Sequence, residues 1–382
     1  MFSRPRPLIA SVMLATTLAS GLSGCGDAGP VGEPPLSEEA LGAVTENPGA
    51  PTRQLARQVD DLFTMEGLGE TRAVVLMHGG TIAAERYAPG YDKDTRFVSW
   101  SMAKTITAVM IGMLVADGRL RLDEPAPVPG WQRPGDPRSE ITLRHLLQMR
   151  SGLDHTEAGP VPTESSEVRM LFLDGRDDMA RWAEEQPLEA EPGSKFEYSS
   201  NTTVILADIA ARALTDSDDP DIRRRAVATY LQARLFEPLG MTSIVPEFDA
   251  AGTLIGGSLM HATARDYARF GDFLRNKGSY RGTQLVPRAW VEKMVTPSPK
   301  SAQYGFQTWL NRPVKGMTGA EHPLFPDRAP HSLFAMIGHM GQYVLISPSK
   351  KLTLVRLGHS DAPQRKAMLQ QAADVIELYP ES

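Results

Sequence analysis

Apolar residues recur with two different periods along this chain. In Arg53–Met65 they return every three or four positions, which predicts an amphipathic helix. Two strand-like runs follow, Ala73–His78 and Ile82–Tyr87, and a pair of glycines between them predicts a hairpin turn. We therefore expect ordered structure to begin near Thr52 with a helix and a β-hairpin.

The next segment, Ser101–Asp117, is apolar on every side. Its helical spacing leaves almost no polar face, and Gly118 is placed to end it. A helix that is apolar all round is buried. This segment is therefore predicted to cross the interior of the domain.

The rest of the chain changes from helical to strand-like patterns. The clearest helices are Leu143–Met149, Thr202–Leu214 and Thr263–Asn276; the strand-like runs are Gln303–Trp309, Ser332–Ile337, Tyr343–Ile346 and Leu352–Leu357, with a last helix over Gln364–Leu378. Strands near both ends with helices between them predict an α+β fold, in which both termini complete one antiparallel sheet and the middle forms an inserted helical lobe, roughly residues 118–295. No repeat or second independent domain is visible.

The first residues have the pattern of an export signal. Arg4 and Arg6 precede a short apolar run, Leu8–Ala19, which is too short for a permanent membrane span. Leu22-Ser23-Gly24-Cys25 then resembles a bacterial lipobox, which implies that Cys25 becomes the lipidated N-terminus; a plain signal peptide with an incidental cysteine is the alternative. We expect a signal peptide over 1–24, a Pro- and Gly-rich flexible tether over 25–52 and a folded domain over 53–382.

The composition excludes some classes of function and of site. The chain has 382 residues, 41% of them hydrophobic, which is enough for a large core. A net charge of -6 gives no basic surface for nucleic acid. Cys25 is the single cysteine, so no disulfide forms within the chain. Because no paired metal-ligand spacing occurs, His145 and His155 are interpreted as structural, and we expect neither metal nor cofactor.

The strongest chemical signal is Ser101-Met102-Ala103-Lys104. Residues three apart lie on one helix face, so the Lys104 amine can reach the Ser101 hydroxyl. Serine needs an adjacent base to become a nucleophile, and a partly buried lysine can serve. Ser101 is therefore the candidate nucleophile and Lys104 its partner.

The same spacing occurs again at Ser347-Pro348-Ser349-Lys350. This copy lies between two predicted strands, its proline fits a turn better than a helix, and Lys351 beside it suggests solvent. We interpret Ser347 as part of a hairpin loop.

Two further segments carry candidate chemistry. Tyr198-Ser199-Ser200-Asn201 precedes a predicted helix. The tyrosine hydroxyl can transfer protons, although for this segment taken alone a helix cap formed by Ser200 or Asn201 is the better explanation. Gly338-His339-Met340-Gly341-Gln342 opens a strand, where glycines permit close approach of a ligand, or simply bend the strand.

In this order the three segments resemble the serine β-lactamase and penicillin-binding-protein superfamily, on the branch of class C β-lactamases, DD-peptidases, family VIII esterases and 6-aminohexanoate-dimer hydrolases. The resemblance covers about residues 53–382. Four more segments support it, in the same order as in that family: Ile141–Leu147 with Ser151–Leu153, Phe236–Met241, Gly256–Leu259 with Ala264–Asp266, and Tyr304–Trp309.

The resemblance implies the roles of the site residues. Ser101 attacks an acyl carbonyl, while Lys104 and Tyr198 share its proton and deliver one to the leaving group. Backbone N–H groups of Ser101 and Gln342 are expected to form the oxyanion hole. The substrate-binding residues implied by the resemblance are Ser200, Asn201, His339, Gly341 and Trp309, although Trp309 could equally pack in the core.

Departures from the family pattern point away from β-lactams. Class C enzymes have Tyr-x-Asn, whereas Ser200 stands second after Tyr198 here, and His339-Met340-Gly341 replaces Lys-Thr-Gly. A lysine keeps a full charge for a substrate carboxylate, but a histidine is mostly neutral near pH 7. The class A glutamate and its Ser-Asp-Asn motif have no match.

We therefore predict a serine hydrolase that cleaves a small ester or amide through an acyl-enzyme, lipid-anchored to the cell envelope. The alternative within enzymes is a DD-peptidase or weak β-lactamase acting on cell-wall peptides or β-lactams. The alternative outside enzymes is a cell-wall ligand binder without turnover, against which Ser101, Lys104 and Tyr198 argue.

Overall fold

The computed structural model describes residues 35–318 and 321–381, and residues 36–381 form one compact unit. The predicted signal peptide and Cys25 lie outside the described residues. No helix among the described residues is both long enough and apolar enough to span a membrane.

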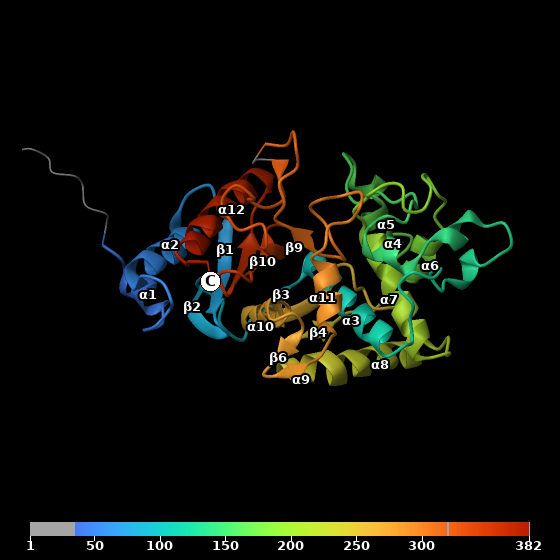
Figure 1. Cartoon of the computed structure of the whole chain (residues 1–382), viewed down its shortest axis with the longest axis horizontal. Helices are drawn as coiled ribbons and strands as arrows, with labels where there is room; N and C mark the ends of the chain where they lie inside the picture. The colour runs from blue at the N-terminus through green and yellow to red at the C-terminus, as the bar shows by residue number, and fades with distance from the viewer. Residues whose placement is uncertain (1–34, 319–320, 382) are drawn as a thin grey trace, which may run out of the picture. The chain divides into compact units, whose positions relative to one another are not determined.

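The core of this unit is a six-stranded sheet built from both ends of the chain. Its order is β2-β1-β11-β10-β9-β8, and every neighbouring pair is antiparallel. The strands are β1 (Glu70–His78), β2 (Thr81–Tyr87), β8 (Trp309–Leu310), β9 (Phe334–Gly338), β10 (Gln342–Ser347) and β11 (Leu352–His359). Figure 1 shows blue N-terminal and red C-terminal strands side by side, which confirms the predicted α+β sheet.

Helices cover both faces of the sheet. Because side chains alternate along a strand, Val74 and Leu76 of β1 pack under α2 (Thr52–Thr64) and α12 (Ala362–Glu377), while intervening β1 residues face α10 (Ala264–Arg275). All three helices were predicted within two residues of their ends. However, α10 falls inside the range predicted for the helical lobe and instead belongs to the sheet layer.

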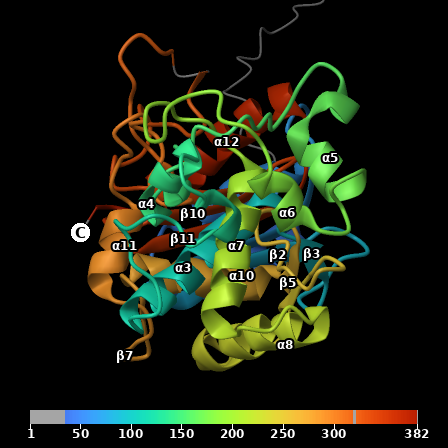
Figure 2. The ribbon, with the colours of Figure 1, turned by 90° about the vertical axis from the view of Figure 1, so that its right-hand side faces the viewer.

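The helical lobe surrounds two buried helices, α3 (Ala103–Ala116) and α7 (Ser200–Leu214), which pack against each other. Figure 2 shows α7 in front of α3 with smaller helices around them. The smaller helices are α4 (Leu143–Leu147), α5 (Ser166–Phe172), α6 (Met179–Glu184), α8 (Pro220–Leu231), α9 (Glu237–Leu239) and α11 (Arg288–Met294). Outside the six-stranded sheet there are also short strands: β3 (Arg96–Val98), β4 (Val245–Pro246), β5 (Met260–Thr263), β6 (Ser279–Tyr280) and β7 (Thr283–Gln284). The apolar helix predicted at 101–117 is thus confirmed.

Ordered structure begins earlier than predicted. Helix α1 (Glu38–Gly42) precedes a bridge between Val44 and Ala84 of the edge strand β2, and the Tyr379 hydroxyl donates to the carbonyl of Pro48 at 3.1 Å. Residues 36–51 are therefore attached to the domain, and the expected tether over 25–52 is wrong for this part. Backbone pairing with a sheet edge needs no apolar periodicity, so the sequence pattern did not reveal it.

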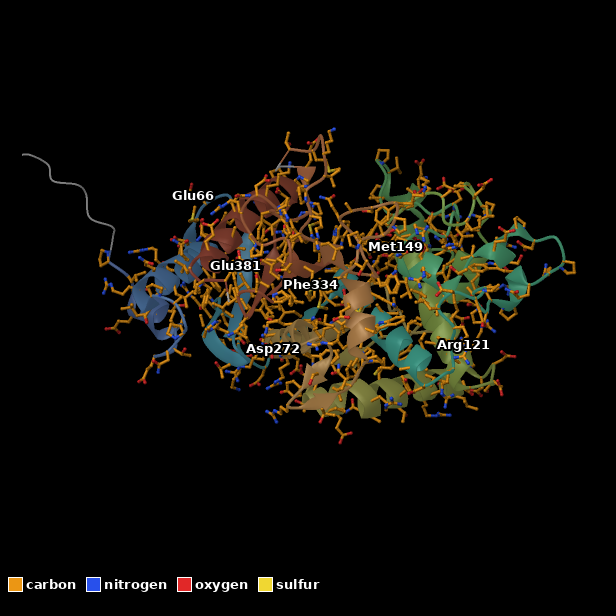
Figure 3. The ribbon with its side chains drawn as sticks, viewed as in Figure 1. Glu66, Arg121, Met149, Asp272, Phe334 and Glu381 are labelled. Carbon is orange, nitrogen blue, oxygen red and sulfur yellow. The ribbon has the colours of Figure 1, made fainter. Side chains whose placement is uncertain are left out.

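The strand predicted over Gln303–Trp309 is mostly irregular. Only Trp309 belongs to β8, and Tyr304 pairs back with Trp309 through an isolated bridge. Gln307 has φ 52°, which no extended strand can contain, because it turns the chain back on itself. Figure 3 marks Phe334 at the start of β9, the strand that follows in the sheet.

Candidate active site

Ser101 lies at a sharp turn between β3 and the buried helix α3. Trp100, directly before it, has φ 44°, a left-handed conformation that a bulky residue rarely adopts. The turn is held by a hydrogen bond from the Ser99 N–H to the Met260 carbonyl at 2.7 Å. As a result Ser101 stays partly exposed while Met102 beyond it is buried.

Lys104 lies beneath Ser101, with only 1% of its surface exposed. Its Nζ donates to Ser101 Oγ at 2.9 Å, to Ser200 Oγ at 2.8 Å and to the Gly257 carbonyl at 2.9 Å. Three donors with three acceptors are the full complement of an ammonium group. Burial opposes this charge, yet Tyr198 and the nearby carboxylates together raise the pKa of Lys104 above its ordinary value. Lys104 is thus an ammonium in this arrangement.

Tyr198 stands beside Lys104 in a cluster of aromatic rings. Lys104 Nζ lies 4.8 Å from the centre of the Tyr198 ring, and the rings of Trp309 and Tyr304 pack at 5.2 and 5.8 Å. Burial raises the pKa of Tyr198, and Lys104 acts in the opposite direction. The structure therefore brings Tyr198 together with Ser101 and Lys104, from two distant parts of the chain.

The residues after Tyr198 are placed differently from what the sequence suggested. Ser199 is the N-cap of α7, accepting from the Thr202 N–H at 3.3 Å, so neither Ser200 nor Asn201 caps the helix. Ser200 and Asn201 are both fully buried; Ser200 contacts Lys104, and Asn201 donates weakly to the Ser166 carbonyl at 3.4 Å. This placement fits support of the site better than direct substrate contact.

The structure places two carboxylates beside this site, and neither of them was identified from the sequence. Glu157 accepts from the Ser200 N–H at 2.6 Å and the Ser200 hydroxyl at 2.7 Å, and lies 3.7 Å from Lys104 Nζ. Glu167 on α5 lies 3.1 Å from Ser200 Oγ. The sequence around Glu157 has no apolar periodicity and so predicts a solvated loop; that prediction is wrong, because the segment folds back onto the start of α7. No motif signals this contact.

The third segment forms the turn between β9 and β10. The His339 ring packs edge-on against Trp100 at 5.5 Å, and burial lowers the pKa of His339, so its imidazole is neutral near pH 7. Gly341 has φ 87° in this turn. The resemblance implies that Gly341 opens an edge strand, and this is wrong, because neither β9 nor β10 is at an edge of the sheet. Gln342 pairs with Gly338, and its side-chain amide donates to the Gly358 carbonyl at 2.6 Å. Its oxyanion role remains a prediction.

The second Ser-x-x-Lys copy, which begins at Ser347, does not form a similar Ser-Lys pair. Ser347 ends β10 and a turn follows, as predicted, but Ser347 is buried rather than solvated, and its hydroxyl has no hydrogen-bond partner. The Lys350 ammonium points away to the carbonyl of Tyr379. Ser347 therefore lacks a base.

Among the residues that the structure describes, no group of three or more His, Cys, Asp or Glu side chains could hold a metal ion. His155 instead binds the Ala183 carbonyl at 3.2 Å, and His145 forms a capping box with Thr142.

Comparison with known proteins gives a consistent result. The model of the family described as Beta-lactamase matches residues 64–377. The 6-aminohexanoate-dimer hydrolase of Paenarthrobacter ureafaciens is 25% identical over 239 residues, 61% of this chain and 59% of that protein. Esterase EstB of Burkholderia gladioli is 32% identical over 211 residues, 49% of this chain and 50% of that protein. The aligned part thus spans only half to three-fifths of these curated relatives.

Among solved structures, a Bacillus anthracis protein provisionally named a 6-aminohexanoate-dimer hydrolase is similar with a TM-score of 0.63 and 23% identity. The match covers 81% of each chain. At this identity the likeness supports the fold, an antiparallel sheet with a helical lobe.

Proposed function

Because this chain belongs to the beta-lactamase family, we propose that it is a serine hydrolase that cleaves small esters or amides through an acyl-enzyme on Ser101. The observation that carries the proposal is the joint hydrogen bonding of Lys104 Nζ to Ser101 and Ser200, with Tyr198 beside it. This arrangement can move a proton to and from the nucleophile without a metal.

The reaction proceeds in two balanced halves. In the reactive form the Lys104–Tyr198 pair has already lost one proton to solvent. Ser101 Oγ bonds to the acyl carbon as its proton passes to this pair; the bond to the leaving group then breaks, and that proton goes to the leaving oxygen or nitrogen. Water next attacks the acyl carbon, gives one proton to the same pair, and displaces Ser101 Oγ, which regains a proton. The N–H groups of Ser101 and Gln342 are proposed donors to the oxyanion.

Charge in the site favours neutral acyl groups. A substrate carboxylate would meet a neutral His339 in place of a lysine, with Glu157 close behind Ser200. A cavity of about 600 Å³ adjoins Trp100 and His339 and includes the rings of Tyr91 and Phe97 in its wall. These rings suit an apolar or aromatic group of a small substrate, although Arg72 and Arg96 line the same cavity.

The test compares substrates under one set of conditions. We expect kcat/KM for short-chain p-nitrophenyl esters to exceed that for nitrocefin by at least about 100-fold, or about 2.7 kcal/mol of differential transition-state binding. Ser101→Ala is the matched control for background hydrolysis. Similar efficiencies on both substrates would favour the alternative β-lactamase or DD-peptidase, and a burst without turnover would favour a binder.

We further propose that the chain is an exported lipoprotein acylated at Cys25, on the basis of Leu22-Ser23-Gly24-Cys25 behind a short apolar run. In its native host, Cys25→Ala should prevent lipidation and cleavage before residue 25. Mass spectrometry that finds an unmodified mature N-terminus beyond Cys25 would overturn this.

A further inference from the structure

Glu157 binds Ser200 with both of its carboxylate oxygens. Oε2 accepts from the backbone N–H at 2.6 Å, and Oε1 accepts from the hydroxyl at 2.7 Å. Accepting at both oxygens is the behaviour of an ionised carboxylate. The bond fixes the direction of the Ser200 hydroxyl proton, which must point at Glu157.

Because the hydroxyl hydrogen of Ser200 points at Glu157, Ser200 Oγ can only accept hydrogen bonds from its other neighbours. Lys104 Nζ approaches at 2.8 Å and donates to one of them. Ser200 is fully buried and so cannot turn to water instead. A chain of contacts therefore runs from Glu157 through Ser200 to Lys104, and from Lys104 to Ser101 at 2.9 Å.

Glu167 is the second carboxyl group beside the Ser200 hydroxyl. Its Oε1 lies 3.1 Å from Ser200 Oγ, whose single hydrogen is already directed to Glu157. Burial, and next the charge of Glu157, raise the pKa of Glu167 to about 7. A protonated Glu167 can donate to the remaining lone pair of Ser200, so two carboxyls, one hydroxyl and one ammonium satisfy one another.

We propose that Glu157 is a positioning residue for acyl transfer: acting through Ser200, it holds Lys104 Nζ against Ser101 and supplies the negative charge that keeps Lys104 an ammonium between turnovers. The inference rests on the proposed function of Ser101. It extends the Ser-Lys-Tyr group by a carboxylate and a hydroxyl, in the way a third residue orients the base of other hydrolases.

The charge of Glu157 acts on a small set of titratable groups. They come from five different segments around Ser101: Lys104 of α3, Glu167 of α5, Tyr198 before α7, Tyr304 before β8, and His339 in the β9–β10 turn. A negative charge opposes loss of a proton from the Lys104–Tyr198 pair. It therefore raises the pH at which Ser101 becomes reactive.

The experiment measures the rate at which a fluorophosphonate probe labels the full-length protein, as a function of pH. This rate reports the reactivity of Ser101 and needs no natural substrate. In Glu157→Gln we expect the plateau rate to fall at least about 10-fold and the acid limb to move to lower pH by at least about half a unit. Ser200→Ala should lose rate similarly, and the double variant should be little worse than either single one.

Glu164→Gln is the matched control, because Glu164 is an exposed carboxylate of the same segment. It should leave both the rate and the limb unchanged. A purely structural role of Glu157 would lower the rate without moving the limb, and an unchanged Glu157→Gln profile would remove any role; either result overturns the inference. Absence of labelling in the unsubstituted protein would instead overturn the proposed nucleophile itself.

Discussion

Lys104 Nζ lies 2.9 Å from Ser101 Oγ, across one turn at the start of α3. An ammonium has no lone pair, so Lys104 cannot accept the serine proton until the Lys104–Tyr198 pair has lost one proton. Tyr198, whose ring lies 4.8 Å from Nζ, is the group beside it that can exchange a proton. We therefore expect the proposed chemistry to depend on both residues rather than on the lysine alone.

Tyr198→Phe tests this dependence. The substitution keeps the ring against Trp309 and removes only the hydroxyl. We expect kcat for a p-nitrophenyl ester to fall about 100-fold or more, the usual contribution of a positioned proton-transfer group. Circular dichroism should show an unchanged fold. Near-normal kcat would exclude Tyr198 from the mechanism and leave Ser101 and Lys104 in place.

Gly338→Ala tests the close approach between β9 and the turn that precedes Ser101. A Cβ at Gly338 would lie 2.4 Å from the Ser99 carbonyl oxygen, so the backbone on one side must move. We expect kcat/KM to fall at least about 10-fold, because small displacements of reacting groups are costly. Gly130→Ala, which meets nothing within 4 Å, is the control. An unaffected Gly338→Ala would mean that the turn tolerates displacement.

Glu167→Gln tests the raised pKa through stability. The pKa of Glu167 is about 7 in the folded chain against an ordinary value of 4.5. The folded state therefore binds more protons than the unfolded state between these values, and the free energy of unfolding falls as pH rises through that window. Glutamine removes this loss. The variant should match the parent near about pH 5 and be more stable near about pH 8, by about 1–2 kcal/mol.

Thermal unfolding followed by circular dichroism at the two pH values checks this. Glu164→Gln, in the same segment and exposed, should behave like the parent at both. Equal stability of Glu167→Gln and the parent at the higher pH would contradict the raised pKa.

Local patterns predicted most of the sheet and the contact between the candidate nucleophile and its lysine. The alternation in β1 and the all-apolar face of α3 reflect burial directly, and Ser101 and Lys104 are neighbours on one helical turn. Glu157 escaped prediction because its partner, Ser200, is 43 residues away and its own segment has no period. The attachment of residues 36–51 to the domain could not be predicted either, because backbone pairing with β2 leaves no periodic pattern of apolar residues.

The most direct test of Ser101 as the nucleophile is intact-protein and peptide mass spectrometry after treatment with a fluorophosphonate. We predict a single adduct on the peptide that contains Ser101, present in Ser347→Ala and absent in Ser101→Ala. Ser347 is a matched control because it has the same spacing to a lysine, Lys350, whose ammonium binds the Tyr379 carbonyl instead. An adduct that persists in Ser101→Ala, or that maps to any other residue, would contradict the account.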